Sequence, residues 1–133
     1  MPNMTPIKTP MNNASGKIGE DYAAELLSKK GYQIIERNYH SRFGEIDIIA
    51  ENEEYIVFAE VKTRDEHFSV SPLEAVTVGK QRKIYKTALL YLQQHKTKLQ
   101  PRFDVIGITT QSGAFTVKSV EYIQNAFSGG GYY

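Results

Sequence analysis

Three charged residues, Asp47, Glu60 and Lys62, stand within two β-rich runs that flank a polar stretch at residues 51–54. This pattern predicts two antiparallel strands, within residues 44–64, joined by a short turn. Side chains alternate between the faces of a strand, so Glu60 and Lys62 lie on the same face. If the turn has an even number of residues, Asp47 lies opposite them and the three charges converge.

The apolar residues of the two strands favour the same register. It places three of them from each strand side by side on the other face, namely Ile46, Ile48 and Ala50 beside Val57, Ala59 and Val61. A slip of one residue would turn every side chain to the wrong face. We therefore expect an even-length turn and a shared charged face.

Two carboxylates on such strands are costly to bury unless something pairs with them. Hard divalent cations take oxygen ligands, and Mg²⁺ typically keeps several waters as well. Asp47, Glu60 and the backbone carbonyl of Val61 could supply such a site. Lys62 could then orient a metal-bound water or stabilise developing negative charge. The alternative is a plain salt bridge between Lys62 and one of these carboxylates on a solvated face, which is the commoner use of charged strand residues.

The motifs themselves resemble a known family. Gly44-Glu45-Ile46-Asp47, followed by Phe58-Ala59-Glu60-Val61-Lys62-Thr63-Arg64, resembles the signature of the YraN-like family, bacterial predicted nucleases of the PD-(D/E)xK superfamily. The layout is similar to that of archaeal Holliday-junction resolvases. The resemblance covers about residues 16–123 and includes Gly19-Glu20, Arg37-Asn38, Lys80-Gln81 and Arg102-Phe103-Asp104.

This resemblance implies an α/β fold with a three-layer, restriction-endonuclease-like core, in which helices flank a central mixed β-sheet. It also implies a Mg²⁺- or Mn²⁺-dependent endonuclease that hydrolyses DNA, including branched or repair intermediates. A helix carboxylate at the Gly-Glu position, here Glu20, would complete the metal or water shell, and Gln81 would lie beside the active site. Alone, Glu20 would be an ordinary first-turn glutamate favoured by the helix dipole. Asp104 either supports the site or pairs locally.

Four positive charges and no negative ones lie between residues 79 and 86, which makes this segment a candidate phosphate-binding patch. They belong to Lys80, Arg82, Lys83 and Lys86. Arg42 and Arg64, close to the predicted hairpin, are further candidates for contact with nucleic acid. For all of them the alternative is a solvated helix or loop face.

Composition narrows the class of protein. A chain of 133 residues forms one domain, and its formal net charge of +1 leaves nucleic-acid binding to local patches. It has no cysteine, which excludes disulfides and thiolate metal sites. No apolar run approaches ~18 residues, and the N-terminus lacks the apolar core of a signal peptide. We therefore expect no membrane contact and a cytoplasmic protein.

The site needs helices and strands on both sides of the hairpin. We expect a flexible arm at residues 1–14, one nuclease-like domain at 15–126 and a glycine-rich flexible tail at 127–133. The elements predicted outside the hairpin are a helix from its N-cap at Ser15 to a stop at Gly31, a strand at 32–38, a loop at 39–43, a helix at about 79–94, and strands at 102–110 and 114–120. Because the central strands form a hairpin, the sheet cannot be all parallel.

Two other functional classes compete with the nuclease hypothesis. A binding module with the same fold would position nucleic acid without cutting it, and a structural protein would use its acidic face to contact a basic partner. Metal-dependent cleavage separates the first class from the others, and salt-sensitive binding separates the second from the third. Symmetric cutting of a two-fold substrate would favour a homodimer.

Overall fold

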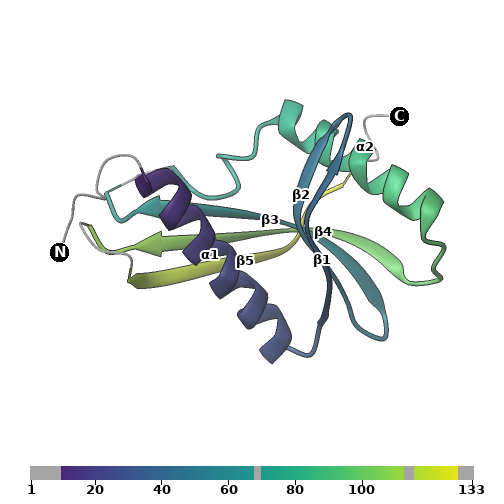
Figure 1. Ribbon diagram of the computed structural model, residues 1–133, viewed down its shortest axis with the longest axis horizontal. Helices are drawn as coiled ribbons and strands as arrows, with labels where there is room; N and C mark the ends of the chain where they lie inside the picture. Colours follow the sequence, from purple (N-terminus) through teal and green to yellow (C-terminus); the bar gives the residue numbers. More distant parts are fainter. Residues whose placement is uncertain (1–9, 68–69, 113–115, 129–133) are drawn as a thin grey trace.

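A computed structural model describes residues 10–67, 70–112 and 116–128. A twisted sheet lies between two helices (Figure 1). In chain order the elements are α1 (Pro10–Lys29), β1 (Gln33–Ser41), β2 (Gly44–Glu51), β3 (Tyr55–Asp65), α2 (Val78–Gln94), β4 (Gln100–Thr110) and β5 (Val117–Phe127).

The sheet has five strands in the order β1-β2-β3-β4-β5. Its neighbouring strands are antiparallel except for β3 and β4, which are parallel. A parallel pair needs a crossover connection, and α2 lies on the one that joins β3 to β4. The sheet is therefore mixed, as expected from the hairpin.

Each face of the sheet carries its own apolar core. Under α2 the core combines strand and helix residues, among them Ile49, Phe58, Phe103, Ile84, Ala88 and Tyr91. Under α1 it contains Ala23, Leu27, Ile48, Val57, Ile106 and Ile108. Burial of each large apolar side chain contributes about 1.5–3 kcal/mol, which holds both helices on the sheet. The α/β fold with three layers is confirmed and is consistent with a restriction-endonuclease-like core.

The predicted register of the central hairpin is confirmed. Ile48 lies opposite Ala59 and Ala50 opposite Val57. The last pair before the turn is Glu51 with Ile56, so an even number of residues joins the strands.

Several element boundaries differ from those expected. α1 begins at Pro10 rather than after Ser15, because proline is tolerated in the first helical turn, where its missing N–H needs no partner. Residues 1–9 and 129–133, which make up most of the expected arm and tail, lie outside the described residues. Phe127, expected in the tail, ends β5 and pairs with Phe103 of β4.

β1 and β5 both end later than predicted. Pairing with a neighbouring strand, rather than local composition, sets where they end. β1 continues to Ser41, so the expected loop at 39–43 shrinks to a turn at Arg42 and Phe43. β5 begins at Val117, and residues 114 and 115, which were expected to open it, lie outside the described residues.

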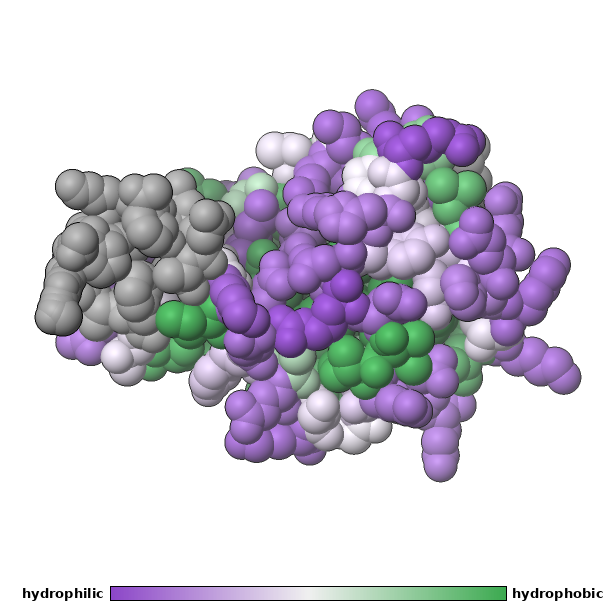
Figure 2. All heavy atoms as spheres, in the orientation of Figure 1, coloured by the Kyte–Doolittle hydropathy of each residue, from purple (hydrophilic) through white to green (hydrophobic). Residues whose placement is uncertain are grey.

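On the face shown in Figure 2, hydrophilic residues cover most of the described surface, and hydrophobic ones form small separate patches. No helix within the described ranges is long and apolar enough to cross a membrane.

Candidate functional site

Asp47 lies where β2 separates from β3. Followed away from the turn, the pairing of these strands ends with Ile48 and Ala59, and Asp47 is the next residue of β2. Beyond that pair, a side chain takes the place of a backbone acceptor. Oδ2 of Asp47 accepts a hydrogen bond of 2.8 Å from the backbone N–H of Val61. The Asp47 carboxylate therefore lies beside β3, and Asp47 is 8% exposed.

A backbone irregularity in β1 accompanies this separation. Arg37 pairs with Ile48 and Tyr39 with Ile46, so the register places Asn38 opposite Asp47. Asn38 has a φ of 54°, in the left-handed region that asparagine tolerates better than most residues.

The side chains of β2 change face at the same place. Residues two apart on a regular strand share a face, yet Ile46 packs in the core under α2 and Ile48 in the core under α1. β2 therefore twists at Asp47. The tip of the β1–β2 hairpin rises beside α2 as a result (Figure 1).

Glu60 is the most buried carboxylate near this twist, at 4% exposure. Its Oε2 atom lies 3.6 Å from Nζ of Lys62 and 3.3 Å from Nζ of Lys80. Its Oε1 atom is buried and has no hydrogen-bond partner among the described residues. Such an atom costs free energy unless a donor or a cation satisfies it.

Asp47 and Glu60 also conflict electrostatically. The pKa of the Asp47 carboxyl is raised to about 8, first because burial disfavours its charge and then because the Glu60 carboxylate repels it. The hydrogen bond from Val61 opposes this rise, and the charge of Glu20 adds to it. The two facing carboxylates thus favour either a proton or a cation between them.

Glu20 reaches the edge of this site from α1. A Cβ atom on the preceding Gly19 would lie 1.8 Å from Oγ1 of Thr63, so only glycine lets α1 approach β3 this closely. Oε1 of Glu20 accepts a 3.3 Å hydrogen bond from Nδ2 of Asn38 and lies 3.8 Å from Nη2 of Arg37. Within the described residues, no three His, Cys, Asp or Glu side chains gather closely enough to hold a metal ion. Glu20 therefore flanks the pair of carboxylates.

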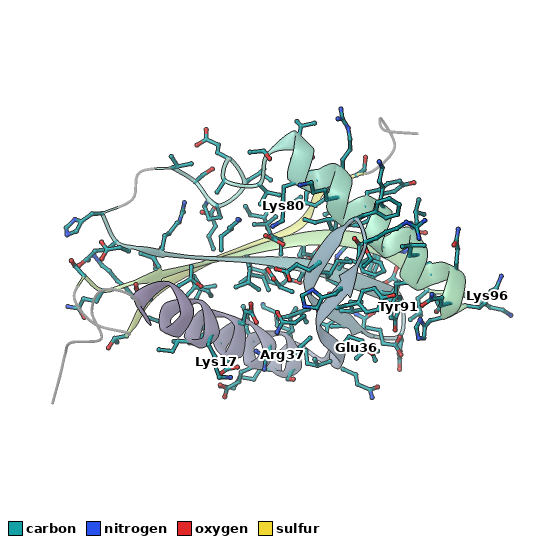
Figure 3. All side chains as sticks on the ribbon, turned by 45° about the horizontal axis from the view of Figure 1, so that its top comes forward. Lys17, Glu36, Arg37, Lys80, Tyr91 and Lys96 are labelled. Carbon is teal, nitrogen blue, oxygen red and sulfur yellow. The ribbon has the colours of Figure 1, made fainter. Side chains whose placement is uncertain are left out.

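Lys80 and Gln81, in the first turn of α2, have different partners. Nε2 of Gln81 donates to the carbonyl of Val76, in the turn before α2, at 3.0 Å. Lys80, predicted as a phosphate contact, reaches Glu60 from the first turn of α2 instead (Figure 3).

The row of buried residues along α2 explains why Lys80 reaches Glu60. It consists of Ile84, Thr87, Ala88 and Tyr91, and Lys80 precedes Ile84 by one helical turn. The neighbouring Tyr85 and Leu92 are only partly buried. Centring the row on the residues that alternate by three and four would have identified Lys80 as facing the sheet.

The other predicted residues fall into three groups. Arg42, Lys83 and Lys86 gather at the tip of the β1–β2 hairpin. Arg82 is exposed on α2, and Nη1 of Arg64 donates to the carbonyl of Val70.

Asp104 pairs locally, as one of its two alternatives predicted. Its carboxylate accepts hydrogen bonds from Arg102 at 3.0 and 2.9 Å and from the hydroxyl of Tyr122 at 2.6 Å. This network is buried on strand β4 and uses both oxygens of Asp104, so it leaves none for a ligand at the Glu60 site.

The donor set fits a hard divalent cation. Mg²⁺ is commonly held by one or two carboxylates, with waters and substrate phosphates completing its shell. Asp47 and Glu60 supply two carboxylates, one of them with an unsatisfied buried oxygen. The backbone carbonyl of Val61 remains a predicted third ligand.

Comparison with known sequences gives a consistent picture. Residues 19–108 match the family described as "Uncharacterised protein family UPF0102". A UPF0102 protein of Caldanaerobacter subterraneus subsp. tengcongensis is 46% identical over 113 residues, which cover 84% of this chain and 93% of the relative. One from Clostridium botulinum (strain Loch Maree / Type A3) is 46% identical over 120 residues, covering 87% and 95%. One from Syntrophomonas wolfei is 44% identical over 123 residues, covering 88% and 100%.

Proposed function

The chain belongs to the uncharacterised protein family UPF0102, and from its site we propose that it is a Mg²⁺- or Mn²⁺-dependent nuclease that hydrolyses phosphodiester bonds of DNA. The observation that carries the proposal is the buried pair of Asp47 and Glu60, with one unsatisfied oxygen and Lys62 beside it. The resemblance of the motifs around these residues to PD-(D/E)xK nucleases and archaeal Holliday-junction resolvases supports the same activity, including action on branched DNA.

Asp47 and Glu60 would hold the cation, with the carbonyl of Val61 as a further ligand. When bound, a divalent cation supplies charge that polarises a phosphodiester and lowers the pKa of a nearby water. The unsatisfied Oε1 of Glu60 is the atom best prepared to bind it, because no protein donor among the described residues has to be displaced.

Lys62 and Lys80 would play different parts. The side chain of Lys62 is 30% exposed and lies at the rim of the site, where its Nζ can orient the attacking water and stabilise negative charge that develops on the phosphate. Lys80 comes from a separate element and holds the Glu60 carboxylate in place. Glu20 adds negative charge beside Asp47, which raises the pKa of that carboxyl and would also attract a cation.

A nucleic-acid-binding module that does not cut is the second candidate. The observation that favours it is the double pairing of Glu60, whose charge Lys62 and Lys80 compensate without any metal. The two candidates differ in what happens when divalent metal is added: a nuclease cleaves the nucleic acid, whereas a binding module only binds it.

A cleavage screen tests the proposal. Branched, flapped, nicked and linear DNA, together with RNA, are incubated with Mg²⁺, Mn²⁺ or EDTA. We expect metal-dependent cleavage of at least one DNA form, and Lys62→Ala should lower its rate by about 100-fold or more. Calorimetry should show Mn²⁺ affinity within several-fold of the parent, because an ammonium group is not a ligand.

Lys17→Ala is the matched control, since it removes an equal charge from the exposed side of α1. Cleavage by Lys62→Ala at the parental rate would refute the part assigned to Lys62. A folded protein that binds Mn²⁺ yet cuts none of the substrates would support the binding module instead.

A further inference from the structure

Three cations and one aromatic ring gather where the tip of the β1–β2 hairpin meets α2. We call this group the hairpin-tip cluster, and it consists of Arg42, Phe43, Lys83 and Lys86. The guanidinium of Arg42 lies 4.8 Å from the centroid of the Phe43 ring, and Nζ of Lys86 lies 5.4 Å from it. Two cations are thus held on one ring, although their charges repel.

Within the part of the chain that the structure describes, these cations have no acidic partners. Among the described residues, none of the three forms an ion pair with a carboxylate. The whole chain has 16 basic and 15 acidic residues, so a group of three basic side chains without a carboxylate is a local excess of charge. Such an excess favours an anionic ligand.

The fold fixes the hairpin tip on the helix. Oγ of Ser41 and Oγ1 of the fully buried Thr87 lie 2.8 Å apart, and the backbone N–H of Phe43 donates to the same Ser41 oxygen at 3.0 Å. Gly44 has a φ of +155°, and a Cβ atom there would lie 3.3 Å from Cβ of Lys83. The lysine stem therefore rests directly on the backbone of the hairpin, which sets the cations before a ligand arrives.

We propose that the hairpin-tip cluster binds the sugar–phosphate backbone of the nucleic-acid substrate, with Phe43 as the positioning residue that holds Arg42 and Lys86. The ring face attracts both cations, and lysine and arginine are the usual contacts to phosphate oxygens. For the identity of its ligand this inference rests on the proposed function. It adds a second contact region on the substrate, separate from the carboxylate pair.

The spacing of the two regions sets what can bridge them. Lys80 and Lys86 are six residues apart on α2, or about 9 Å at the helical rise. Phe43 and Asp47 are four residues apart at the start of β2, or about 13 Å at the strand rise. An oligonucleotide that contacts the hairpin-tip cluster with one phosphate can therefore place another phosphate at the carboxylate pair.

Binding of a labelled DNA oligonucleotide in EDTA, where cleavage cannot interfere, tests the proposal. Phe43→Leu leaves the net charge unchanged, so a diffuse positive field predicts no effect. We expect this variant to bind about three- to tenfold more weakly, because it removes the ring on which both cations rest. Phe43→Tyr, which keeps a ring, should bind within about twofold of the parent.

The charge variants provide the second readout. Arg42→Gln and Lys86→Gln should each flatten the log–log salt dependence of binding by roughly 0.9 for every duplex phosphate that the variant no longer neutralises. Lys96→Gln is the matched control, because it removes the same charge just beyond the far end of α2 (Figure 3) and should leave the slope unchanged. Thermal melts confirm that each variant is folded.

A small substrate separates this inference from the proposed function. Bis(4-nitrophenyl) phosphate has a single phosphate, so its hydrolysis by the parent in Mn²⁺ reports on the carboxylate pair, whereas the KM of Phe43→Leu for the oligonucleotide should rise. If parent and Phe43→Leu bind DNA equally, the hairpin-tip cluster is refuted and the nuclease proposal stands. If the variants bind weakly as expected but no protein cuts DNA, the cluster stands and the nuclease proposal fails. A parent that binds no nucleic acid overturns both.

Discussion

Asp47 is the residue whose ionisation links the site to the stability of the protein. Its pKa is raised to about 8 by burial and by Glu60, whereas a carboxyl in an unfolded chain titrates near about 3.9. Between these two values the folded, metal-free protein holds a proton that the unfolded chain has lost. Its free energy of unfolding therefore falls as pH rises from about 4 to about 8, then levels off.

Asp47→Asn should remove this dependence. An asparagine oxygen can still accept the hydrogen bond from Val61, and the neutral amide no longer repels Glu60. We expect parent and variant to have similar unfolding free energies near pH 4, and the variant to be more stable at pH 8, by an amount on the order of a few kcal/mol. Urea unfolding in EDTA across this range measures the difference.

Glu121→Gln provides a control, because it makes the same charge change on an exposed residue of β5. Its difference from the parent should stay small at every pH. A variant at position 47 that is less stable than the parent at pH 8 would show that the carboxylate is a structural partner and that the electrostatic conflict is minor.

At the scale of elements, the twist of β2 opens the site, and Asn38 holds the backbone that allows it. Asn38→Ala places a less suitable residue in the left-handed region and removes the amide that contacts Glu20. We expect a loss of about 1–2 kcal/mol in stability. Asn38→Gly keeps the backbone conformation and should lose less, although it also releases Glu20.

Asn125 offers a matched comparison, because it has a similar φ of 52° but lies on β5, where its N–H contacts Asp104. Asn125→Ala should destabilise the protein about as much while leaving Mn²⁺ affinity unchanged. Both Asn38 variants should weaken Mn²⁺ binding. Equal Mn²⁺ affinity in all of them, measured by calorimetry, would mean that Asn38 serves the fold alone.

The same element shows what sequence reasoning can and cannot reach. The register of β2 and β3 was predictable because alternating apolar residues in a hairpin leave few alternatives. The twist at Asp47 was not, because it depends on a left-handed asparagine in another strand and on the α2 core that receives Ile46. The extension of β1 to Ser41 was missed for a similar reason, since only pairing with β2 makes that polar stretch a strand.

At the scale of the whole molecule, the proposed metal should stabilise the fold as well as serve catalysis. A ligand that binds only the folded state adds about 2.7 kcal/mol at 100 times its Kd, or a few degrees in Tm for a chain of this length. We expect Mn²⁺ to raise the Tm of the parent by this amount. Glu60→Gln removes one of the two proposed carboxylate ligands, so its Tm should gain little from Mn²⁺.

Melting curves with Mn²⁺ or EDTA, with Glu121→Gln as the charge control, decide this point. A parent that melts at the same temperature in Mn²⁺ and in EDTA would exclude the proposed metal site.

The three-layer arrangement was predictable from the order of elements, because a hairpin followed by a helix and further strands admits few sheets. The site was predictable only where its residues lie close in sequence. Asp47, Glu60 and Lys62 share one hairpin, whereas Lys80 enters through the crossover to β4 and its approach depends on how α2 packs. That packing decides that Lys80, and not Gln81, reaches the Glu60 carboxylate.

Lys80 follows β2 and β3 in the chain, which has a consequence during synthesis and folding. β2 and β3 are among the most apolar segments of the protein, and exposed strands of this kind tend to associate with other chains. Before the crossover closes, Asp47, Glu60 and Lys62 stand in these segments as charges, the feature that keeps unfinished strands from aggregating. We therefore expect a variant that is neutral at both Asp47 and Glu60 to aggregate more than the parent during refolding.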